Sequence, residues 1–420
     1  MSGLSLFAAF GIELEYMIVD GKRLSIRPIA DRILVDRDGD PVADLEFGAI
    51  AWSNELVNHV IELKTNGPAR SLAGLAAQFA ENVSTANKRL AKFGARLMPT
   101  AMHPWMDPVR EKQLWLGESS EIYDTFDRIF NCAGHGWVNL QSTHLNLPFS
   151  GDDQFGALHA ATRLILPLLP ALAASSPIHD GKQSPYQDSR LYHYVHHCDA
   201  IPSVVGPIIP EAVFTEADYH RNILQPMYED LTQHDAQGVL KEEFLNARGA
   251  IARFTRGSLE IRLIDVQECP AADLAIAALV IGAIRLLVDE TFLSRKEQQA
   301  FDTSRLQQIL HQTTAQAADS LVTDADFLRH LGFSPAQAAA GSPAGEIWRH
   351  LFAKVSKQPN AFPDQLQEMC ESILQAGPLS KRILTACHHD FSPTRLRSVY
   401  GRLCDCLAEN RLFHAESVQN

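Results

Sequence analysis

Four short segments of the chain alternate apolar residues with charged or polar ones, a pattern typical of β-strands that bury one face. These segments cover residues 10–17, 60–66, 141–147 and 258–263, and two of them end longer stretches, 55–66 and 137–147, that are predicted as strands. Acidic residues are depleted in strands, so an ordinary half-exposed sheet would carry fewer of them than these segments do. The pattern therefore predicts a sheet with one apolar face against a core and a second face that carries function.

The first segment contains the acidic pair on which the functional interpretation rests. In Gly11-Ile12-Glu13-Leu14-Glu15-Tyr16, Glu13 and Glu15 share one face and lie about 7 Å apart, at twice the rise of a strand. Two like charges on one face repel each other, and a divalent cation between them would remove that cost. Taken alone, the pair is explained equally well by a strand face in contact with solvent.

The other three segments repeat the arrangement. Their polar faces carry the pairs Glu62 and Lys64, His144 and Asn146, and Glu260 and Arg262. We expect the four faces to converge on one site. Carboxylates with one imidazole suit Mg²⁺ or Mn²⁺, and neighbouring arginines suit a phosphoryl group that is transferred across such a metal.

Net charge and missing motifs exclude several classes of protein. The 420 residues include 37 Lys and Arg against 50 Asp and Glu, a formal net charge of −13 that argues against nucleic acid as a partner. The sequence has no G-x-x-x-x-G-K-[ST] motif, no G-x-G-x-x-G before a helix and no kinase motifs. If the chain binds ATP, it does so with a different fold.

Cysteine and hydropathy patterns predict a soluble, cytoplasmic protein without a membrane partner. The seven cysteines include no C-x-x-C pair, which favours reduced thiols. The most apolar stretch, residues 274–287, is interrupted by Arg285 and is too short to span a bilayer.

Helical spacing and turn residues divide the chain into two parts. Helices are predicted at residues 71–93, 119–130, 155–174 and 271–293. Pro167 and Pro170 should kink or break the third of these. The segment 249–265 is predicted to form two strands that turn at Arg256-Gly257. The pattern then becomes almost wholly helical, so we expect a mixed catalytic body at 1–294 and a helical C-terminal region at 295–420.

The segments that carry these residues also resemble a known family. In chain order they are Gly11-Ile12-Glu13-Leu14-Glu15, Val60-Ile61-Glu62-Leu63-Lys64-Thr65, His103-Pro104, Thr143-His144-Leu145-Asn146-Leu147-Pro148, Ala173-Ala174-Ser175-Ser176-Pro177, Ser189-Arg190 and Arg256-Gly257-Ser258-Leu259-Glu260-Ile261-Arg262. At these positions the sequence resembles the glutamate–cysteine ligase and carboxylate–amine ligase family, relatives of glutamine synthetase. The resemblance spans roughly residues 8–290, and the last 125 or so residues resemble no family.

The resemblance implies a fold and a reaction. The fold is α+β, a glutamine synthetase-like antiparallel sheet shaped as a funnel and flanked by helices. ATP and Mg²⁺ would bind at one end of the funnel and the amino-acid substrate at the other. ATP would phosphorylate the carboxylate of L-glutamate, and an amine such as L-cysteine would attack the acyl phosphate. Glutamate–cysteine ligase activity, the γ-glutamyl step of glutathione biosynthesis, is the first interpretation.

The resemblance also implies roles for individual residues. The metal shell would consist of Glu13, Glu15, Glu62, His144 and Glu260. Arg262 and Arg190 would be catalytic ligands of the phosphoryl group or the transition state. Nucleotide binding would involve Lys64, Asn146 and Arg256. The partners would be small molecules, with a homodimer left open.

Some features leave the activity open. Many bacterial carboxylate–amine ligases carry His-x-His where this chain has His144-Leu145-Asn146, a form nearer to dedicated glutamate–cysteine ligases. The Ser-Ser-Pro segment at 175–177 instead resembles the broader group, so the amine acceptor is undecided. A general carboxylate–amine ligase, an ATP-dependent phosphotransferase and a non-catalytic nucleotide-binding relative are alternatives. For His103, beside a proline in a turn, a structural role is favoured.

Overall fold

A computed structural model describes residues 3–359 and 361–415 of the chain. Its centre is an eight-stranded antiparallel sheet with the order β2-β3-β4-β1-β6-β10-β9, and β5 pairs with the far half of β1. The strands are β1 (Gly11–Asp20), β2 (Asp44–Phe47), β3 (Ile50–Asn54), β4 (Val60–Thr65), β5 (Ala95–Met98), β6 (Ser142–Pro148), β9 (Ala250–Arg253) and β10 (Ser258–Asp265). The expected antiparallel sheet is confirmed.

The four segments predicted as functional strands are β4, β1, β6 and β10, which are consecutive neighbours in the sheet. Two were predicted too long. Strand β4 begins at Val60 rather than at residue 55, and β6 begins at Ser142, because a helical turn occupies His135–Val138 before it. The turn predicted at Arg256-Gly257 joins β9 to β10, and Gly257 adopts the left-handed conformation there, with φ at +64°.

Helices cover the apolar face of the sheet. The first part of the chain contains α1 (Leu75–Ala91), α2 (Pro108–Glu111), α3 (Ser120–Phe130), α4 (His135–Val138), α5 (Gly151–Ile165), α6 (Leu169–Ala173), α7 (Ser189–Val195), α8 (Glu216–Tyr219), α9 (Gln225–Leu231) and α10 (Pro270–Val288). Helix α5 ends just before Pro167, and a 3₁₀ turn separates it from α6, so the predicted break is confirmed. A π-helical turn at His220–Leu224 joins α8 to α9.

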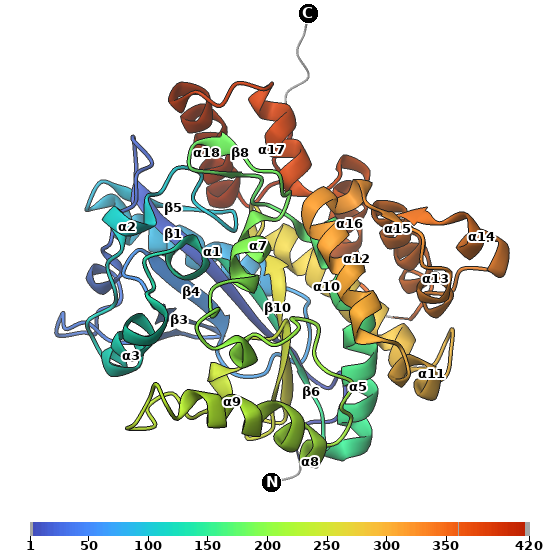
Figure 1. The fold of residues 1–420 in the computed structure, drawn as a ribbon. Coiled ribbons are helices and arrows are strands. Elements are labelled where there is room, and N and C mark those ends of the chain that lie inside the picture. Colours follow the sequence, from blue (N-terminus) through green and yellow to red (C-terminus); the bar gives the residue numbers. More distant parts are fainter. Residues whose placement is uncertain (1–2, 360, 416–420) are drawn as a thin grey trace, which may run out of the picture.

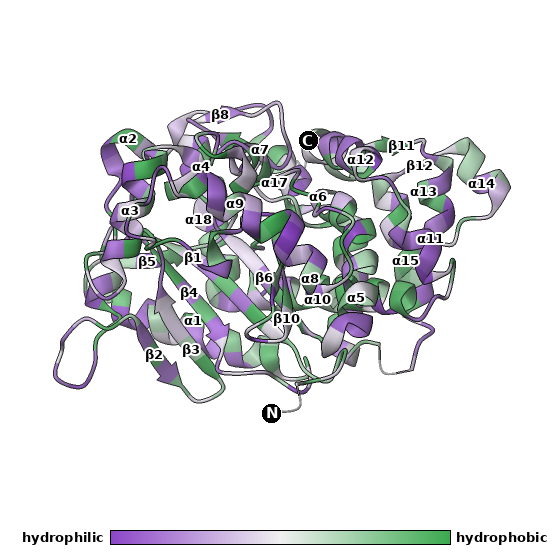
Figure 2. Ribbon diagram, turned by 60° about the horizontal axis from the view of Figure 1, so that its bottom comes forward, coloured by the Kyte–Doolittle hydropathy of each residue, from purple (hydrophilic) through white to green (hydrophobic). Residues whose placement is uncertain are grey.

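The apolar side chains of the strands pack against α1, α5 and α10. Ile12, Leu14 and Tyr16 of β1 are fully buried, as are Phe79 of α1 and Ile276 of α10. Figure 2 shows hydrophilic and hydrophobic residues interspersed along the strands, as the alternating sequence predicts. One face of the sheet thus forms the core, and the polar side chains are left on the other.

Eight α-helices follow residue 294 in the described chain. They are α11 (Arg295–Gln299), α12 (Thr303–Gln316), α13 (Ala325–His330), α14 (Pro335–Ala340), α15 (Ala344–Val355), α16 (Asp364–Ala376), α17 (Leu379–Cys387) and α18 (Pro393–Glu409). In Figure 1, α11 to α16 lie beside the sheet in orange, and α17 and α18 lie above it in red. Residue pairs form short strands at Ile178–His179 (β7), Lys182–Gln183 (β8), Leu321–Val322 (β11) and Ser342–Pro343 (β12). The domain boundary at 295 remains a prediction.

Two helical stretches are long and apolar enough to cross a membrane by length and composition. They are Gly151–Ala173 and Pro270–Val288, and 100% and 83% of their most apolar windows are buried inside the protein. The first also contains the buried Arg163, whose Nε donates to the carbonyl of Pro210 at 2.8 Å. Both stretches are core helices of the fold.

Candidate active site

The register of the sheet brings the predicted polar residues side by side. Glu13 on β1 lies opposite Lys64 of β4 and His144 of β6, and Glu15 lies opposite Glu62. One strand further, Glu260 lies opposite Asn146. Pairing partners in an antiparallel sheet point to the same face, so these seven residues on four strands form one polar surface.

Hydrogen bonds fix the carboxylates and the imidazole of this surface. Oε2 of Glu13 lies 2.9 Å from Nδ1 of His144, and its Oε1 accepts a bond of 2.9 Å from the amide of Asn146. Gly11 permits this approach, because a Cβ there would lie 2.9 Å from Cβ of Asn146. Oε2 of Glu15 accepts bonds from the backbone N–H of Ser142 at 2.7 Å and its hydroxyl at 3.1 Å.

Lys64 and Ser53 hold the remaining carboxylate of the group. The hydroxyl of Ser53 donates to Oε1 of Glu62 at 2.7 Å, and Nζ of Lys64 lies 3.3 Å from the same oxygen. Lys64 also reaches Asp44 at 2.9 Å. One lysine is therefore shared between the buried Glu62 and the more exposed Asp44.

Two groups of ligand atoms on this polar surface lie close enough to share a metal ion. Glu13, Glu62 and His144 form one group, and Glu15, Glu55 and Glu62 form the other, with the atoms of each within 4.8 Å of one another. Glu62 belongs to both. Glu55 was missed by the sequence analysis, which merged it into a strand from 55 to 66. It lies one residue beyond the end of β3.

The electrostatics of these carboxylates fit a divalent cation. Burial raises the pKa of Glu13, Glu15 and Glu55, and repulsion from a neighbouring carboxylate raises each pKa further. Burial and the charge of Glu13 raise the pKa of Glu62 to about 7. The protein alone therefore disfavours a fully ionised cluster. Oxygen ligands with a single imidazole match the preferences of Mg²⁺ and Mn²⁺.

Glu260 has different neighbours from the other predicted ligands. Its Oε1 lies 2.9 Å from Nε of Arg262, and its Oε2 accepts a bond of 3.1 Å from Nη1 of Arg253. Although burial opposes ionisation, these arginines and His144 lower the pKa of Glu260. Among the described residues, it is outside both groups of close ligand atoms. Arg253, on β9, was not singled out from the sequence.

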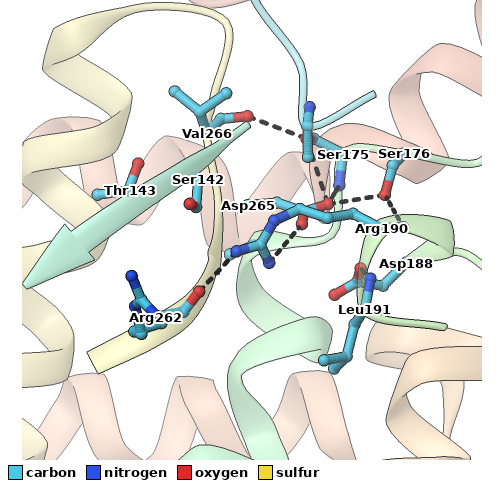
Figure 3. A network of polar contacts seen from close by, with 12 residues as sticks. Ser142, Thr143, Ser175, Ser176, Asp188, Arg190, Leu191, Arg262, Asp265 and Val266 are labelled. Carbon is cyan, nitrogen blue, oxygen red and sulfur yellow. Dashed lines mark hydrogen bonds and ion pairs between the residues drawn. The ribbon is translucent and has the colours of Figure 1, made fainter. Parts of the chain in front are cut away.

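Arg190 is buried in a polar network behind strand β10 (Figure 3). Its Nη2 donates to the carbonyl of Arg262 at 2.6 Å, and its Nη1 lies 3.4 Å from Oδ1 of Asp265. Oδ2 of Asp265 accepts bonds from the backbone N–H of Ser175 at 2.8 Å and the hydroxyl of Ser176 at 2.9 Å. Two of the segments that carry the family resemblance, at 173–177 and 189–190, therefore meet at one aspartate.

Asp188 and Arg190 connect this network to the N-terminus of α7. The side chain of Asp188 caps α7 by accepting a bond of 2.8 Å from the N–H of Leu191. The backbone N–H of Arg190 donates to the hydroxyl of Ser176 at 3.1 Å. The network thus fixes α7 against β10, and Arg190 holds the backbone that carries Arg262.

Two cavities meet at the polar surface. One, of about 550 Å³, has the cationic side chains Lys64, Arg253 and Arg256 in its wall together with Asn146. The other, of about 400 Å³, lies toward α3, α4 and α7. Both are lined by Glu15, Glu55, His144 and Arg262. These four shared residues lie where the two cavities meet, and we call them the waist of the site.

His103 lies away from this waist. It is fully buried, its Nε2 donates to the carbonyl of Leu24 at 2.7 Å, and burial lowers its pKa to about 4. The backbone N–H of His103 also donates to Oδ1 of Asn139, and its carbonyl accepts a bond from Nδ2 of Asn139. His103 therefore connects the backbone at Leu24 with Asn139. These contacts give His103 a structural role.

Comparison with known proteins shows the family and the fold of the chain. The family model for glutamate–cysteine ligase family 2 matches residues 9–387. The prediction that the last 125 or so residues resemble no family was therefore wrong, because the match includes most of the helical C-terminal region. An uncharacterized protein of Archaeoglobus fulgidus is 36% identical over 282 residues, which is 67% of this chain and 75% of that protein. The chain therefore belongs to glutamate–cysteine ligase family 2, and the class that this family defines is a ligase.

Solved structures show the same fold at low sequence identity. The crystal structure of glutamate–cysteine ligase from Francisella tularensis in complex with AMP superimposes with a TM-score of 0.60 at 13% identity, covering 97% of this chain and 90% of that one. A bifunctional glutathione synthetase from Pasteurella multocida gives 0.55 at 14% identity, covering 96% of this chain and 52% of that one. At these identities the agreement concerns the fold, which is glutamine synthetase-like.

Proposed function

We propose that the protein is an ATP-dependent ligase that joins a carboxylate to an amine through an acyl phosphate. The observation that carries the proposal is the waist, where carboxylates and Arg262 line two cavities of different composition. A phosphoryl group transferred from a nucleotide in one cavity to a carboxylate in the other would pass this point. We assign L-glutamate as the carboxylate donor and L-cysteine as the first acceptor to test, in line with the name of the family.

The nucleotide belongs in the larger cavity. Lys64, Arg253 and Arg256 supply positive charge there, and Asn146 supplies an amide. A Mg²⁺ or Mn²⁺ ion held by Glu13, Glu15, Glu55, Glu62 and His144 would neutralise charge on the phosphates. Arg262 is suited to the transferring phosphoryl group, because it lines both cavities and its side chain remains 23% exposed although it pairs with Glu260.

The proposed reaction has two steps. An oxygen of the carboxylate attacks the γ-phosphorus of ATP, the bond to the β-phosphate oxygen breaks, and ADP leaves. The amine nitrogen then attacks the acyl carbon, the acyl–oxygen bond breaks, and inorganic phosphate leaves while the amine loses a proton. Arg190 acts as a positioning residue, since it holds the backbone of Arg262.

We place the enzyme in the cytoplasm.

The alternatives differ in their products. A general carboxylate–amine ligase would accept other amines, a phosphotransferase would leave the phosphoryl group on its acceptor, and a binding relative would release no ADP. Hydroxylamine tests the acyl phosphate that a ligase requires, because this small nucleophile converts acyl phosphates into hydroxamates. We expect ADP and glutamyl hydroxamate in equal amounts with ATP, Mg²⁺ and L-glutamate. ADP release without hydroxamate would contradict the ligase proposal, and so would absence of both products with any carboxylate.

A further inference from the structure

The smaller cavity has an unusually apolar wall for a site that would receive an amino acid. Its described lining includes the side chains of Ile122, Tyr123, Phe126, Trp137, Tyr194 and Phe244. The nucleotide cavity, in contrast, is lined by Lys64 and several arginines. Such a concentration of aromatic rings in a cavity of about 400 Å³ is typical of pockets that bind apolar ligands.

Three of the aromatic rings in this wall, those of Phe126, Trp137 and Phe244, come from three different segments. Phe126 on α3 is 5.2 Å from Trp137 of α4 and 6.4 Å from Phe244, measured between ring centroids. Phe244 lies in a 3₁₀ turn, Glu243–Leu245. All three rings are only partly buried although they pack against one another. Their remaining apolar surface therefore faces the cavity, and covering it with an apolar ligand would be favourable.

Charge is confined to the end of this cavity that meets the waist. The charged residues among its described lining are Glu15, Glu55, Arg190 and Arg262. Both terminal nitrogens of Arg190 are already bonded inside the protein. His197 also lines the cavity, but burial lowers its pKa to about 4, so it is neutral near pH 7. Among the described lining residues, the aromatic end itself contributes no charged side chain.

The polar end of the cavity sets the direction of a bound amine. The nitrogen must reach the waist, which Glu15, Glu55 and Arg262 line and where the acyl phosphate would form. The ring of Tyr123 lies nearby, because its hydroxyl accepts a bond of 2.9 Å from Asn54, the residue before Glu55. An amine bound in this direction places the rest of its structure among Phe126, Trp137 and Phe244.

We infer that the amine acceptor has an aromatic body, as in an arylalkylamine, rather than the small polar side chain of cysteine. The inference rests on the proposed ligase function and names the substrate class of its second cavity. The aromatic group fills the apolar wall, and the amine projects toward Glu55 and the waist. Cysteine would leave most of the apolar wall uncovered.

The test compares acceptors in the same reaction. ADP release with ATP, Mg²⁺ and L-glutamate is measured with phenethylamine, tyramine, hexylamine, cysteine and hydroxylamine. We expect kcat/KM for phenethylamine or tyramine to exceed that for cysteine by about tenfold or more, as expected when an apolar group fills a hydrophobic pocket. If hydroxamate forms but no aromatic amine exceeds cysteine, the inference is wrong and the ligase function stands.

Two variants test whether the apolar wall is responsible. Phe126→Ala and Phe244→Ala each remove one ring from a different segment, and Phe93→Ala removes an exposed ring elsewhere as a matched control. Either cavity variant should lower the ratio of kcat/KM for phenethylamine to kcat/KM for hydroxylamine by about tenfold. The control should leave both reactions unchanged. Equal preference for phenethylamine in the wild type and in a folded cavity variant would overturn the inference.

Calorimetry separates this inference from the ligase function. If no carboxylate yields hydroxamate, the proposed function fails, and phenethylamine is titrated into the protein without nucleotide. Saturable binding that Phe126→Ala or Phe244→Ala weakens, and Phe93→Ala does not, would support the aromatic pocket on its own. No saturable binding to the wild type would overturn it.

Discussion

Nη2 of Arg190 donates a hydrogen bond of 2.6 Å to the backbone carbonyl of Arg262, so the two arginines are connected but differ in environment. Arg190 is 2% exposed and bonded at both terminal nitrogens. The side chain of Arg262 lines both cavities. Arg190 therefore positions strand β10, whereas Arg262 can contact the transferring phosphoryl group. We expect variants of Arg190 to lose stability and variants of Arg262 to lose turnover.

Arg262→Lys should lose turnover with little loss of stability. Lysine cannot hold two phosphate oxygens with a planar fork, and removal of one such donor typically lowers kcat by about 10²–10³. The fold should tolerate the change, because Glu260 retains Arg253 as an ion-pair partner at 3.1 Å. The measurements are kcat, ATP affinity and melting temperature. A lowered melting temperature with near-normal kcat would contradict the catalytic role.

Arg190→Met should destabilise the fold. The change leaves the fully buried carboxylate of Asp265 without its cation, and breaking a buried ion pair typically costs about 3–5 kcal/mol. Urea unfolding measures the free energy directly. Arg256→Met is the matched control, because Arg256 is exposed and its replacement should change the free energy of unfolding by less than about 0.5 kcal/mol. Equal stability of the two variants would show that the network contributes little.

Glu62→Gln should weaken metal binding more than any other single change in the cluster. Glu62 belongs to both groups of ligand atoms, and a ligand that binds the native state raises the melting temperature. Mg²⁺ should therefore stabilise the wild type, stabilise Glu55→Gln less, and leave Glu62→Gln almost unchanged. Glu46→Gln, at an exposed strand position, serves as the control and should respond like the wild type. A full Mg²⁺ response in Glu62→Gln would remove it from the metal site.

The contribution of three buried histidines to stability should fall as the solution is acidified below pH 6.5, whereas the raised pKa values of Glu13, Glu15, Glu55 and Glu62 act in the opposite direction. Burial lowers the pKa of His59 and His159 to about 3 and that of His103 to about 4, against about 6.5 in an unfolded chain. The unfolded state therefore binds more protons in this window. The stabilisation is complete above pH 6.5 and is lost progressively toward pH 3, by up to about 1.4 kcal/mol per pH unit for each histidine.

His159→Gln tests this pH dependence at one position. In the wild type, Nδ1 of His159 donates to the carbonyl of Val213 at 2.7 Å, and a glutamine amide keeps a donor without a titratable group. Urea unfolding at pH 7.5, 6.5 and 5.5 should give a shallower loss of stability for the variant. Parallel pH profiles would mean that His159 does not contribute.

The period of the strands allowed the functional face to be predicted from the sequence. Alternation assigns each residue to a face, so Glu13 and Glu15 separate from Ile12 and Leu14 without any structure. Alternation says nothing about which strands are neighbours. The pairing of Glu13 with both Lys64 and His144 depends on the order of strands, which long-range packing determines.

Residues outside clear strands were not predictable in the same way. Glu55 lies just past the end of β3, a strand that the sequence analysis did not predict, and so appeared as part of the next strand. Asp265 could be placed on a strand, but its partner Arg190 is 75 residues away in a loop-rich segment. Local patterns contain no information about such a contact. The aromatic wall depends likewise on α3, α4 and the turn at 243–245 coming together.

The acyl phosphate is tested most directly by following the transfer of an oxygen atom from the glutamate carboxylate to inorganic phosphate. L-glutamate labelled with ¹⁸O in its side-chain carboxylate is incubated with ATP, Mg²⁺ and hydroxylamine, and the phosphate is analysed by mass spectrometry. An acyl phosphate requires one labelled oxygen in each phosphate released with the hydroxamate. Unlabelled phosphate beside newly formed hydroxamate would contradict the proposed mechanism at this site.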